Sequence, residues 1–287
     1  MKSSASCEPP APGRPVEIEA PTNRWLVHPL SRALVDVLIR TPATPNQVSV
    51  SSVFVAAAGA ACYVGLPWPW NAPAGLVFQI AWHVLDGADG DLARRTGRAS
   101  PIGELVDGIC DHVSQAILYV ALAIILRRAL GDWAWILAFG AGLSHFVQAN
   151  AYESGRKTYR RWVYGAAWMR QSQAEARGPL QRALGALYLA VSSLFSPGEA
   201  RVEVAMAGDP PGARELYLRR FAPLVSASGV LGANARTVAA FLAVLAGSPL
   251  WFFLWEITAL NVALAAFTVM RARRNAAFVS ALDPPAP

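Results

Sequence analysis

Charged residues are scarce in this chain: Asp, Glu, Lys and Arg make up 15% of its 287 residues, whereas soluble domains carry about 25%. Hydrophobic residues make up 54% of the chain and include ten tryptophans. This composition argues against a large water-soluble domain and favours a protein embedded in lipid.

Cysteine is also rare. The three cysteines (Cys7, Cys62 and Cys110) are odd in number and widely spaced, which argues against a disulfide framework and a cysteine-rich zinc site. Residues 1–23 contain five prolines and no apolar run. They show no cleavable signal peptide and are predicted to form a disordered cytoplasmic tail. Residues 279–287 are predicted to form a second disordered tail.

The net charge of +6 raises the question of nucleic-acid binding. The cations, however, lie beside apolar segments, as they do in the cytoplasmic loops of membrane proteins. We therefore expect membrane lipids, and no nucleic acid, among the partners of the chain.

The apolar runs predict an all-α polytopic membrane protein. Residues 24–40 carry apolar side chains at helical spacing with charges between them, which predicts an amphipathic helix in the membrane interface. Residues 44–275 then hold six runs, most of them near the roughly 20 residues that cross a bilayer. The predicted spans are Val48–Val64, Ala72–Leu92, Leu105–Leu126, Trp133–Ala151, Thr237–Ala246 and Leu250–Met270. The pattern does not define where the fifth span begins, because residues 221–231 are also mostly apolar.

Lys and Arg follow the second, fourth and sixth predicted spans, whereas the turns after the first and fifth carry none. By the positive-inside rule, both termini and the basic loops are predicted to face the cytoplasm. Arg127 and Arg128, after the third span, are the exception. Residues 159–220 are predicted to be a cytoplasmic or interfacial connection, in which residues 180–195 are apolar enough for a surface or re-entrant helix.

The most informative segment carries four aspartates. Asp86 and Asp89 lie near the end of the second predicted span, and Asp107 and Asp111 near the beginning of the third. At 100° per residue, the first pair lies about 60° apart around its helix and the second pair about 40° apart. Each pair therefore shares a face. The short connection predicts antiparallel neighbouring helices whose acidic faces converge.

Ionised carboxylates beside hydrocarbon require a cation. An alternative is that these aspartates cap helix ends or pair with nearby arginines. That alternative accounts for a single aspartate more easily than for four at these spacings. Carboxylate oxygens suit Mg²⁺, Mn²⁺ or Ca²⁺ rather than zinc or copper, and metals that bridge phosphates are typical of phosphoryl transfer. Asp111 is the candidate base for an attacking hydroxyl, and Arg94 is placed to bind a phosphate oxygen. Asp91 points about 140° away from Asp86 and is excluded from the ligand set.

The segment Asp86-Gly-Ala-Asp89-Gly90-Asp-Leu-Ala93-Arg94, followed after eight residues by Gly103-x3-Asp107-x3-Asp111, resembles the signature of the CDP-alcohol phosphatidyltransferase family. That signature is D-x2-D-G-x2-A-R-x8-G-x3-D-x3-D, and every fixed position of it is present here. Thr44-Pro45-Asn46 also resembles the Pro-Asn element of the family.

The resemblance implies that Asp86, Asp89 and Asp107 ligate two divalent metals, Mg²⁺ or Mn²⁺. It implies that Asp111 adds a ligand and serves as the base. The implied nucleotide-binding residues are Asn46, Gly90, Ala93, Arg94 and Gly103. The resemblance further implies a homodimer whose active site opens at the cytoplasmic face of the membrane.

Other polar residues have two interpretations each. Arg156, Lys157 and Arg160 either bind an acceptor or donor phosphate or contact lipid headgroups. For His83, His112 and His145 we favour packing over support of a metal-binding carboxylate. Glu256, in the sixth span, is predicted to be an isolated intramembrane acid with no partner.

The predicted reaction transfers a phosphate-linked alcohol from a CDP-activated lipid donor, preferably CDP-diacylglycerol, to the hydroxyl of a polar alcohol acceptor. CMP is released, and the reaction belongs to phospholipid biosynthesis. The converse transfer, of a CDP-headgroup to a lipid alcohol, stays open. Three alternatives are weaker: an intramembrane prenyltransferase, which has other aspartate spacings; a cation transporter, whose carboxylates would spread over several helices; and a non-catalytic lipid-binding scaffold.

Overall fold

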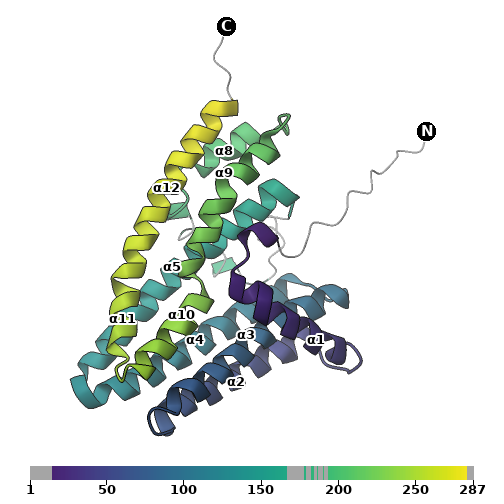
Figure 1. The fold of residues 1–287 in the computed structure, drawn as a ribbon. Helices are drawn as coiled ribbons and strands as arrows, with labels where there is room; N and C mark the ends of the chain where they lie inside the picture. Colours follow the sequence, from purple (N-terminus) through teal and green to yellow (C-terminus); the bar gives the residue numbers. More distant parts are fainter. Residues whose placement is uncertain are drawn as a thin grey trace.

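The computed structural model describes residues 15–166 and 193–282, together with five isolated positions between them (178, 182, 183, 186 and 190). Every regular element in this part of the chain is a helix, as Figure 1 shows. The prediction of an all-α fold is confirmed. Most of the helix predicted for residues 180–195 lies outside the described residues.

Four helices contain the first four predicted spans. They are α2 (Pro45–Gly65), α3 (Asn71–Arg95), α4 (Pro101–Leu130) and α5 (Trp133–Tyr164). A capping box starts α2, in which the Thr44 side chain accepts the Gln47 N–H and the Gln47 side chain accepts the Thr44 N–H. Because α5 continues to Tyr164, the basic residues predicted for a loop after the fourth span lie on a helix instead.

The helix α2 is the common partner of the next two helices, since both α3 and α4 pack closely on it. Small residues allow this approach: a Cβ atom at Gly75 of α3 would lie 2.4 Å from a ring carbon of Tyr63 on α2. Among the described residues, α3 and α4 pack on α2 rather than closely on each other. The sequence predicts α3 and α4 to be antiparallel neighbours, but each packs closely on α2 instead.

The C-terminal half contains interrupted helices. Its elements are α8 (Glu199–Met206), α9 (Ala213–Ala227), the 3-10 turn η3 (Ser228–Leu231), α10 (Ala233–Leu245), α11 (Leu250–Ile257) and α12 (Ala259–Leu282). The fifth predicted span, Thr237–Ala246, corresponds to α10, which begins at Ala233, one residue after η3. The sixth, predicted as one helix, is interrupted at Thr258 between α11 and α12.

Four stretches of the described residues are long and apolar enough to cross a bilayer. They are Pro45–Gly65, Ile102–Leu130, Ala213–Leu245 and Leu250–Leu282. The last two stretches include the interruptions at η3 and Thr258. These four stretches support an integral membrane protein.

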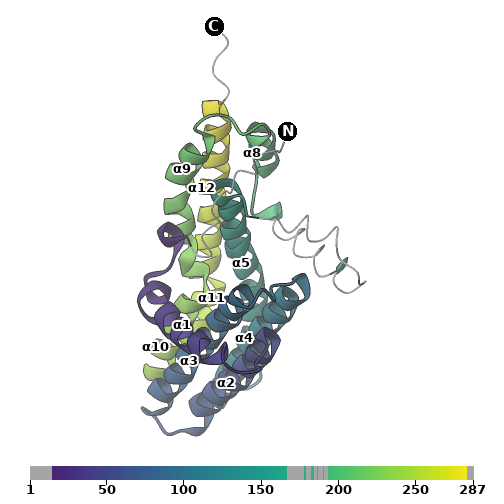
Figure 2. The ribbon, with the colours of Figure 1, turned by 90° about the vertical axis from the view of Figure 1, so that its right-hand side faces the viewer.

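The helices enclose two main cores. The first joins α2, α4, α5, α10 and α11 around Leu122 and Phe253. The second, around Tyr159, Tyr217 and Phe278, lies where α5, α9 and α12 extend together beyond the α2–α4 group, as both views show (Figures 1 and 2). The aromatic rings of the second core contact one another, with Tyr217 and Phe221 stacked at 4.1 Å.

The segment before α2 forms η1 (Val16–Ile18), η2 (Asn23–Val27) and α1 (His28–Leu38). Disorder through residue 23 is therefore a wrong prediction for residues 15–23. Ile18 is only 2% exposed within the second core, and the Glu17 carboxylate accepts hydrogen bonds from Tyr159 (2.8 Å) and Tyr164 (2.6 Å). These partners are distant in sequence, so local composition does not predict them.

Disorder was also predicted for residues 279–287, but residues 279–282 belong to α12. Residues 1–14 and 283–287, the remainder of the two predicted tails, lie outside the described residues.

Candidate active site

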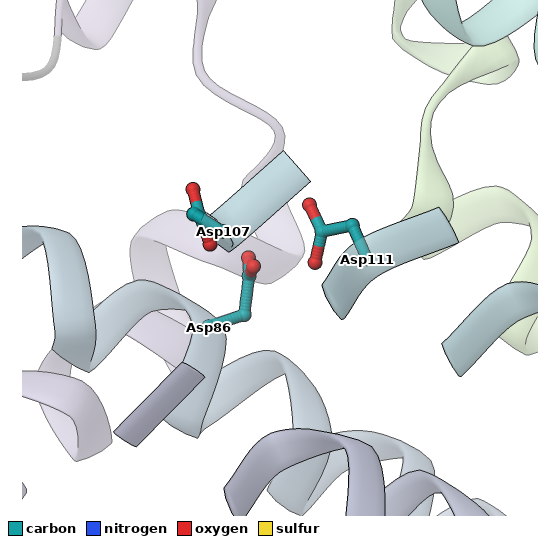
Figure 3. A group of neighbouring side chains, drawn as sticks. All are labelled: Asp86, Asp107 and Asp111. Atoms are coloured by element: carbon teal, nitrogen blue, oxygen red, sulfur yellow. The ribbon is translucent and has the colours of Figure 1, made fainter. Parts of the chain in front are cut away.

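Three carboxylates from two helices converge. Asp86 of α3 and Asp107 and Asp111 of α4 each offer an oxygen atom, and these atoms lie within 4.8 Å of one another. Figure 3 shows Asp86 facing the other two side chains. All three residues are partly exposed, so a ligand can approach them. We call Asp86, Asp107 and Asp111 the carboxylate group.

The backbone at the ends of α3 and α4 fixes this arrangement. The end of α3 is a Schellman-type turn, in which Gly97 is left-handed (φ 66°) and the Arg98 N–H reaches the Ala93 carbonyl at 2.9 Å. The start of α4 is capped by the Ser100 hydroxyl, which accepts the Gly103 N–H at 3.0 Å. The chain thus reverses within the few residues between the two helices.

Asp89 lies beside the carboxylate group but is more deeply buried. It is 3% exposed, and its Oδ2 atom accepts a hydrogen bond from Ser49 Oγ of α2 at 2.5 Å. Its carboxyl is also in hydrogen-bonding contact with that of Asp107. Asp89 is therefore joined to the carboxylate group through Asp107, with a serine on its other side.

The donor set is suited to a hard divalent cation. Like-charged carboxyl groups at this separation repel unless a cation or a proton lies between them. Clustered carboxylate oxygens are typical ligands of Mg²⁺, Mn²⁺ and Ca²⁺. The residues present therefore fit the divalent metal expected from the sequence.

Arg94 lies at the edge of this region and pairs with Asp91, three residues earlier on α3. Its guanidinium covers Gly90, because a Cβ atom there would lie 3.3 Å from Nη1 of Arg94. The Arg94 side chain is 46% exposed. Asp91 thus belongs to a surface ion pair, outside the carboxylate group.

Asn46 comes from the first turn of α2 and approaches the beginning of α4. Its Oδ1 atom lies 3.6 Å from the point that a Cβ atom would occupy at Gly103. Ala93 is partly buried on the last turn of α3. Asn46 and Ala93 thus lie where α3 ends and α4 begins.

The three predicted phosphate-binding cations differ in their surroundings. Arg156 pairs with Glu153 at 3.0 Å, and Lys157 pairs with Glu104 of α4 at 2.7 Å. Arg160 forms no ion pair with any described residue. Burial lowers the pKa of the Arg160 guanidinium; Glu153 opposes this shift, whereas Arg156 and Arg94 add to it.

The histidines mostly pack. His83 is buried, and its Nε2 lies 2.9 Å from Thr237 Oγ1 of α10. His145 is buried with its ring against Tyr119. His112 is exposed, with Nδ1 at 2.7 Å from the Gly108 carbonyl of its own helix. The packing interpretation agrees with the contacts of His83 and His145.

Glu256 is not isolated, so that prediction is wrong. It forms an ion pair with Arg236 of α10 at 2.9 Å, and the two side chains are 0% and 1% exposed. Arg236 also donates to Gln148 Oε1 at 2.6 Å and to the Leu231 carbonyl. The sequence pattern places Glu256 on a helix but does not show which helix it faces.

Ser49 was also missed. It lies one turn after Asn46 on α2, so the two residues share a helix face. A polar residue at that spacing in an apolar helix was the available signal. What the sequence does not provide is the contact with Asp89, forty residues away.

Comparison with known proteins identifies the family. A family model described as CDP-alcohol phosphatidyltransferase matches residues 43–204, which include all four aspartates. The chain is 32% identical over 178 residues to the bifunctional IPC transferase and DIPP synthase of Rubrobacter xylanophilus, covering 61% of this chain and 40% of that protein.

Two shorter matches are to enzymes named differently from the Rubrobacter protein. The chain is 32% identical over 97 residues to archaetidylinositol phosphate synthase of Aeropyrum pernix (33% of this chain, 47% of that protein). It is 35% identical over 89 residues to cholinephosphotransferase 1 of Gallus gallus (30% and 26%). The chain thus spans less than half the length of these curated relatives.

Proposed function

The chain belongs to the CDP-alcohol phosphatidyltransferase family, and we propose that it transfers a phosphate-linked alcohol from a CDP-alcohol to an acceptor hydroxyl with release of CMP. The observation that carries this proposal is the convergence of Asp86, Asp107 and Asp111 within 4.8 Å, with Asp89 adjoining Asp107. Clustered carboxylates of this kind are suited to holding the cations that neutralise a diphosphate.

We assign Asp86, Asp89, Asp107 and Asp111 to two divalent cations, Mg²⁺ or Mn²⁺. When bound, these cations stabilise negative charge on the phosphate oxygens and on the leaving group. Asp111 accepts the proton of the acceptor hydroxyl. Its carboxyl adjoins that of Asp86, and its Oδ1 atom has no hydrogen-bond partner among the described residues. The acceptor oxygen then bonds to the donor phosphorus, and the bond from phosphorus to the CMP oxygen breaks.

We assign the nucleotide to the region where α3 ends and α4 begins. Arg94 supplies the charge for a phosphate oxygen, and its contact with Asp91 at the surface exchanges readily because such pairs are weak. Gly90, Ala93 and Gly103 present little side-chain bulk, so that the nucleotide approaches the backbone. Asn46, close to Gly103, offers an amide for the base or ribose.

We propose that the donor is CDP-diacylglycerol and that the acceptor carries a phosphate. Arg160 supports the second assignment, because it forms no ion pair with any described residue and lies near the positive charges of Arg156 and Arg94 as well as the carboxylates of Glu153 and Glu104. The names of the Rubrobacter and Aeropyrum relatives are compatible with such chemistry. The name of the Gallus relative instead favours the second candidate, transfer of a CDP-headgroup to a lipid alcohol.

We propose six membrane spans, with an interfacial helix at residues 24–40 and with both termini and the active site on the cytoplasmic side. Large tryptophans are exposed at the turn before α3, at the start of α5 and at the start of α11 (Trp70 70%, Trp133 69%, Trp251 63%). Interfacial tryptophans of this kind suit the membrane face opposite the basic residues. The exposed Trp25 and Leu30 suit contact of residues 24–40 with lipid. The homodimer is a further proposal, from family membership.

The test is release of CMP from CDP-diacylglycerol by the purified chain with Mg²⁺ or Mn²⁺, over a panel of phosphorylated and unphosphorylated alcohols. We expect release that requires one phosphorylated acceptor and stops with EDTA. Release only from a CDP-headgroup with a lipid alcohol would favour the second candidate. Pyrophosphate release from a prenyl donor, or no turnover of any donor by folded protein, would contradict the proposal.

A further inference from the structure

Ser49 on α2 touches the candidate active site directly. Its Oγ lies 2.5 Å from Asp89 Oδ2, and both residues are 3% exposed. We infer that Ser49 is a positioning residue that holds Asp89 in the orientation needed to bind a divalent cation. This inference rests on the proposed function, because it takes the aspartates to be cation ligands.

The hydroxyl has one proton and two nearby acceptors. The Pro45 carbonyl, four residues earlier, lies 3.3 Å from Ser49 Oγ, whereas the Asp89 carboxylate lies 2.5 Å away. Hydrogen bonds to ionised acceptors are shorter and stronger than neutral ones. The proton therefore goes to Asp89.

Asp89 has two donors: the backbone N–H of Gly90 on its own helix and the Ser49 hydroxyl on α2. An ionised carboxylate is only an acceptor, and its other side-chain contact is the carboxyl of Asp107. The hydrogen bond from Ser49 engages Oδ2 and fixes the plane of the carboxylate. The remaining oxygen, Oδ1, is then presented in a constant direction, which is how neighbouring groups usually tune a ligand.

The backbone that carries Ser49 is held firmly. The capping box of Thr44 and Gln47 fixes the first turn of α2. One face of α2 then packs on α3 at Gly59 and Gly75, where added Cβ atoms would lie 2.9 Å from Phe78 Cβ and 2.4 Å from the Tyr63 ring. Ser49 is therefore a rigid donor, and rigid support is what a precise ligand geometry requires.

The chain offers a matched control. Ser52, one turn further along α2, is also buried (1% exposed), but its hydroxyl donates to the Ser49 carbonyl of the same helix at 2.7 Å. Ser52→Ala removes a buried hydroxyl without touching an aspartate. Any difference between Ser49→Ala and Ser52→Ala thus reflects the contact with Asp89.

The experiment measures cation binding apart from catalysis. Purified protein in detergent is titrated with Mn²⁺, and the thermal midpoint is followed at each concentration; CMP release is then measured over the same range. We expect Ser49→Ala to raise the half-saturating Mn²⁺ concentration by about ten- to a hundredfold in both assays. Ser49→Thr keeps the hydroxyl, so its half-saturating Mn²⁺ concentration should lie within about threefold of the wild-type value. Ser52→Ala should have the wild-type value.

Ser49→Cys provides a second variant if Ser49→Ala does not fold, because the thiol keeps the volume of the side chain but is a weaker donor. We expect its half-saturating Mn²⁺ concentration to lie between those of the wild type and Ser49→Ala. An unchanged Mn²⁺ midpoint in Ser49→Ala or Ser49→Cys would overturn the inference, even if the metal-free protein were less stable. Wild-type protein that Mn²⁺ does not stabilise would also overturn it. A midpoint shift in protein that releases no CMP would leave Ser49 in its role and contradict only the proposed reaction.

Discussion

Two groups of charged side chains lie among the helices of this molecule, and they are built in opposite ways. At the carboxylate group, side chains of the same sign contact one another: Asp107 adjoins Asp89, and Asp86 adjoins Asp111. In the second group, Arg236 and Glu256 carry charges of opposite sign, and both side chains are almost completely buried. The first group is partly open to solvent and the second is closed.

The difference indicates which charges serve a ligand and which serve the fold. Arg236 donates to Glu256, to Gln148 and to the Leu231 carbonyl, so its charge is compensated within the protein. Under the proposed function, divalent cations compensate the aspartates. We therefore expect substitutions at the two places to separate activity from stability.

The largest expected effect is that of Asp107→Asn. Because Asp107 belongs to the carboxylate group and also contacts Asp89, its loss should reduce CMP release by on the order of 10³-fold or more. Removal of one negative charge should also raise the thermal midpoint in EDTA by about 2–4 °C. Activity assays and thermal unfolding in detergent check both effects. Near-wild-type turnover would contradict the metal assignment, and a lower midpoint would contradict the argument from repulsion.

The second prediction concerns Glu256→Gln, which leaves the Arg236 charge buried without its counter-charge. Breaking such a pair costs about 3–5 kcal/mol of stability, whereas the dependence of residual activity on Mn²⁺ should be unchanged. Unfolding by denaturant in detergent micelles measures the loss.

The control is the double variant Arg236→Met with Glu256→Gln, which removes both charges. It should be more stable than Glu256→Gln alone, because no uncompensated charge remains. Losses that simply add in the double variant would show that the pair is not coupled.

Arg160 tests the proposed acceptor site, because it is a cation that forms no ion pair with any described residue. Arg160→Ala should raise the KM of a phosphorylated acceptor by about ten- to a hundredfold, because a charged hydrogen bond is lost, and should leave an unphosphorylated acceptor unaffected. Arg161→Ala is the matched control, since Arg161 pairs with Glu203 at 2.8 Å. Equal effects of the two variants on KM would remove Arg160 from the acceptor site.

The smallest effect is expected for Asp91→Asn. Asp91 is an aspartate of the same segment, but its charge is compensated by Arg94 at the surface, where such pairs contribute about 0–1 kcal/mol. We expect kcat/KM for the CDP donor to change by less than about fivefold. A loss as complete as that of Asp107→Asn would place Asp91 among the ligands and show that the helical register is wrong.

Much of this arrangement follows from local pattern. Helical spacing predicts that Asp86 can meet Asp107 and Asp111, since each pair shares a face and a short connection reverses the chain. The starts of α2 and α5 are also well marked, by Thr44-Pro45 and by Trp133. Such features depend on residues close together in sequence, where rotation per residue is known.

The remaining features depend on contacts between distant helices. The pattern of α2 does not reveal that Ser49 meets Asp89, and that of α11 does not reveal that Glu256 meets Arg236. Hydropathy stays high across Thr258, so the interruption between α11 and α12 is hidden as well. It is stabilised by Asn261 Nδ2 and Gln148 Nε2, which donate to the Ile257 and Glu256 carbonyls at 2.8 and 3.1 Å.

The pairing of Arg236 with Glu256 also constrains how the protein is made. The helices that carry them, α10 and α11, have 13 and 8 residues, and Arg236 leaves the ribosome before Glu256. An arginine alone in hydrocarbon is costly, so we expect α10 to wait at the membrane surface until α11 has been synthesised. The two helices then enter as a neutral hairpin. Nascent chains that end before Glu256 should accordingly leave a cysteine placed at residue 240 open to a water-soluble maleimide, and chains that extend beyond α11 should protect it.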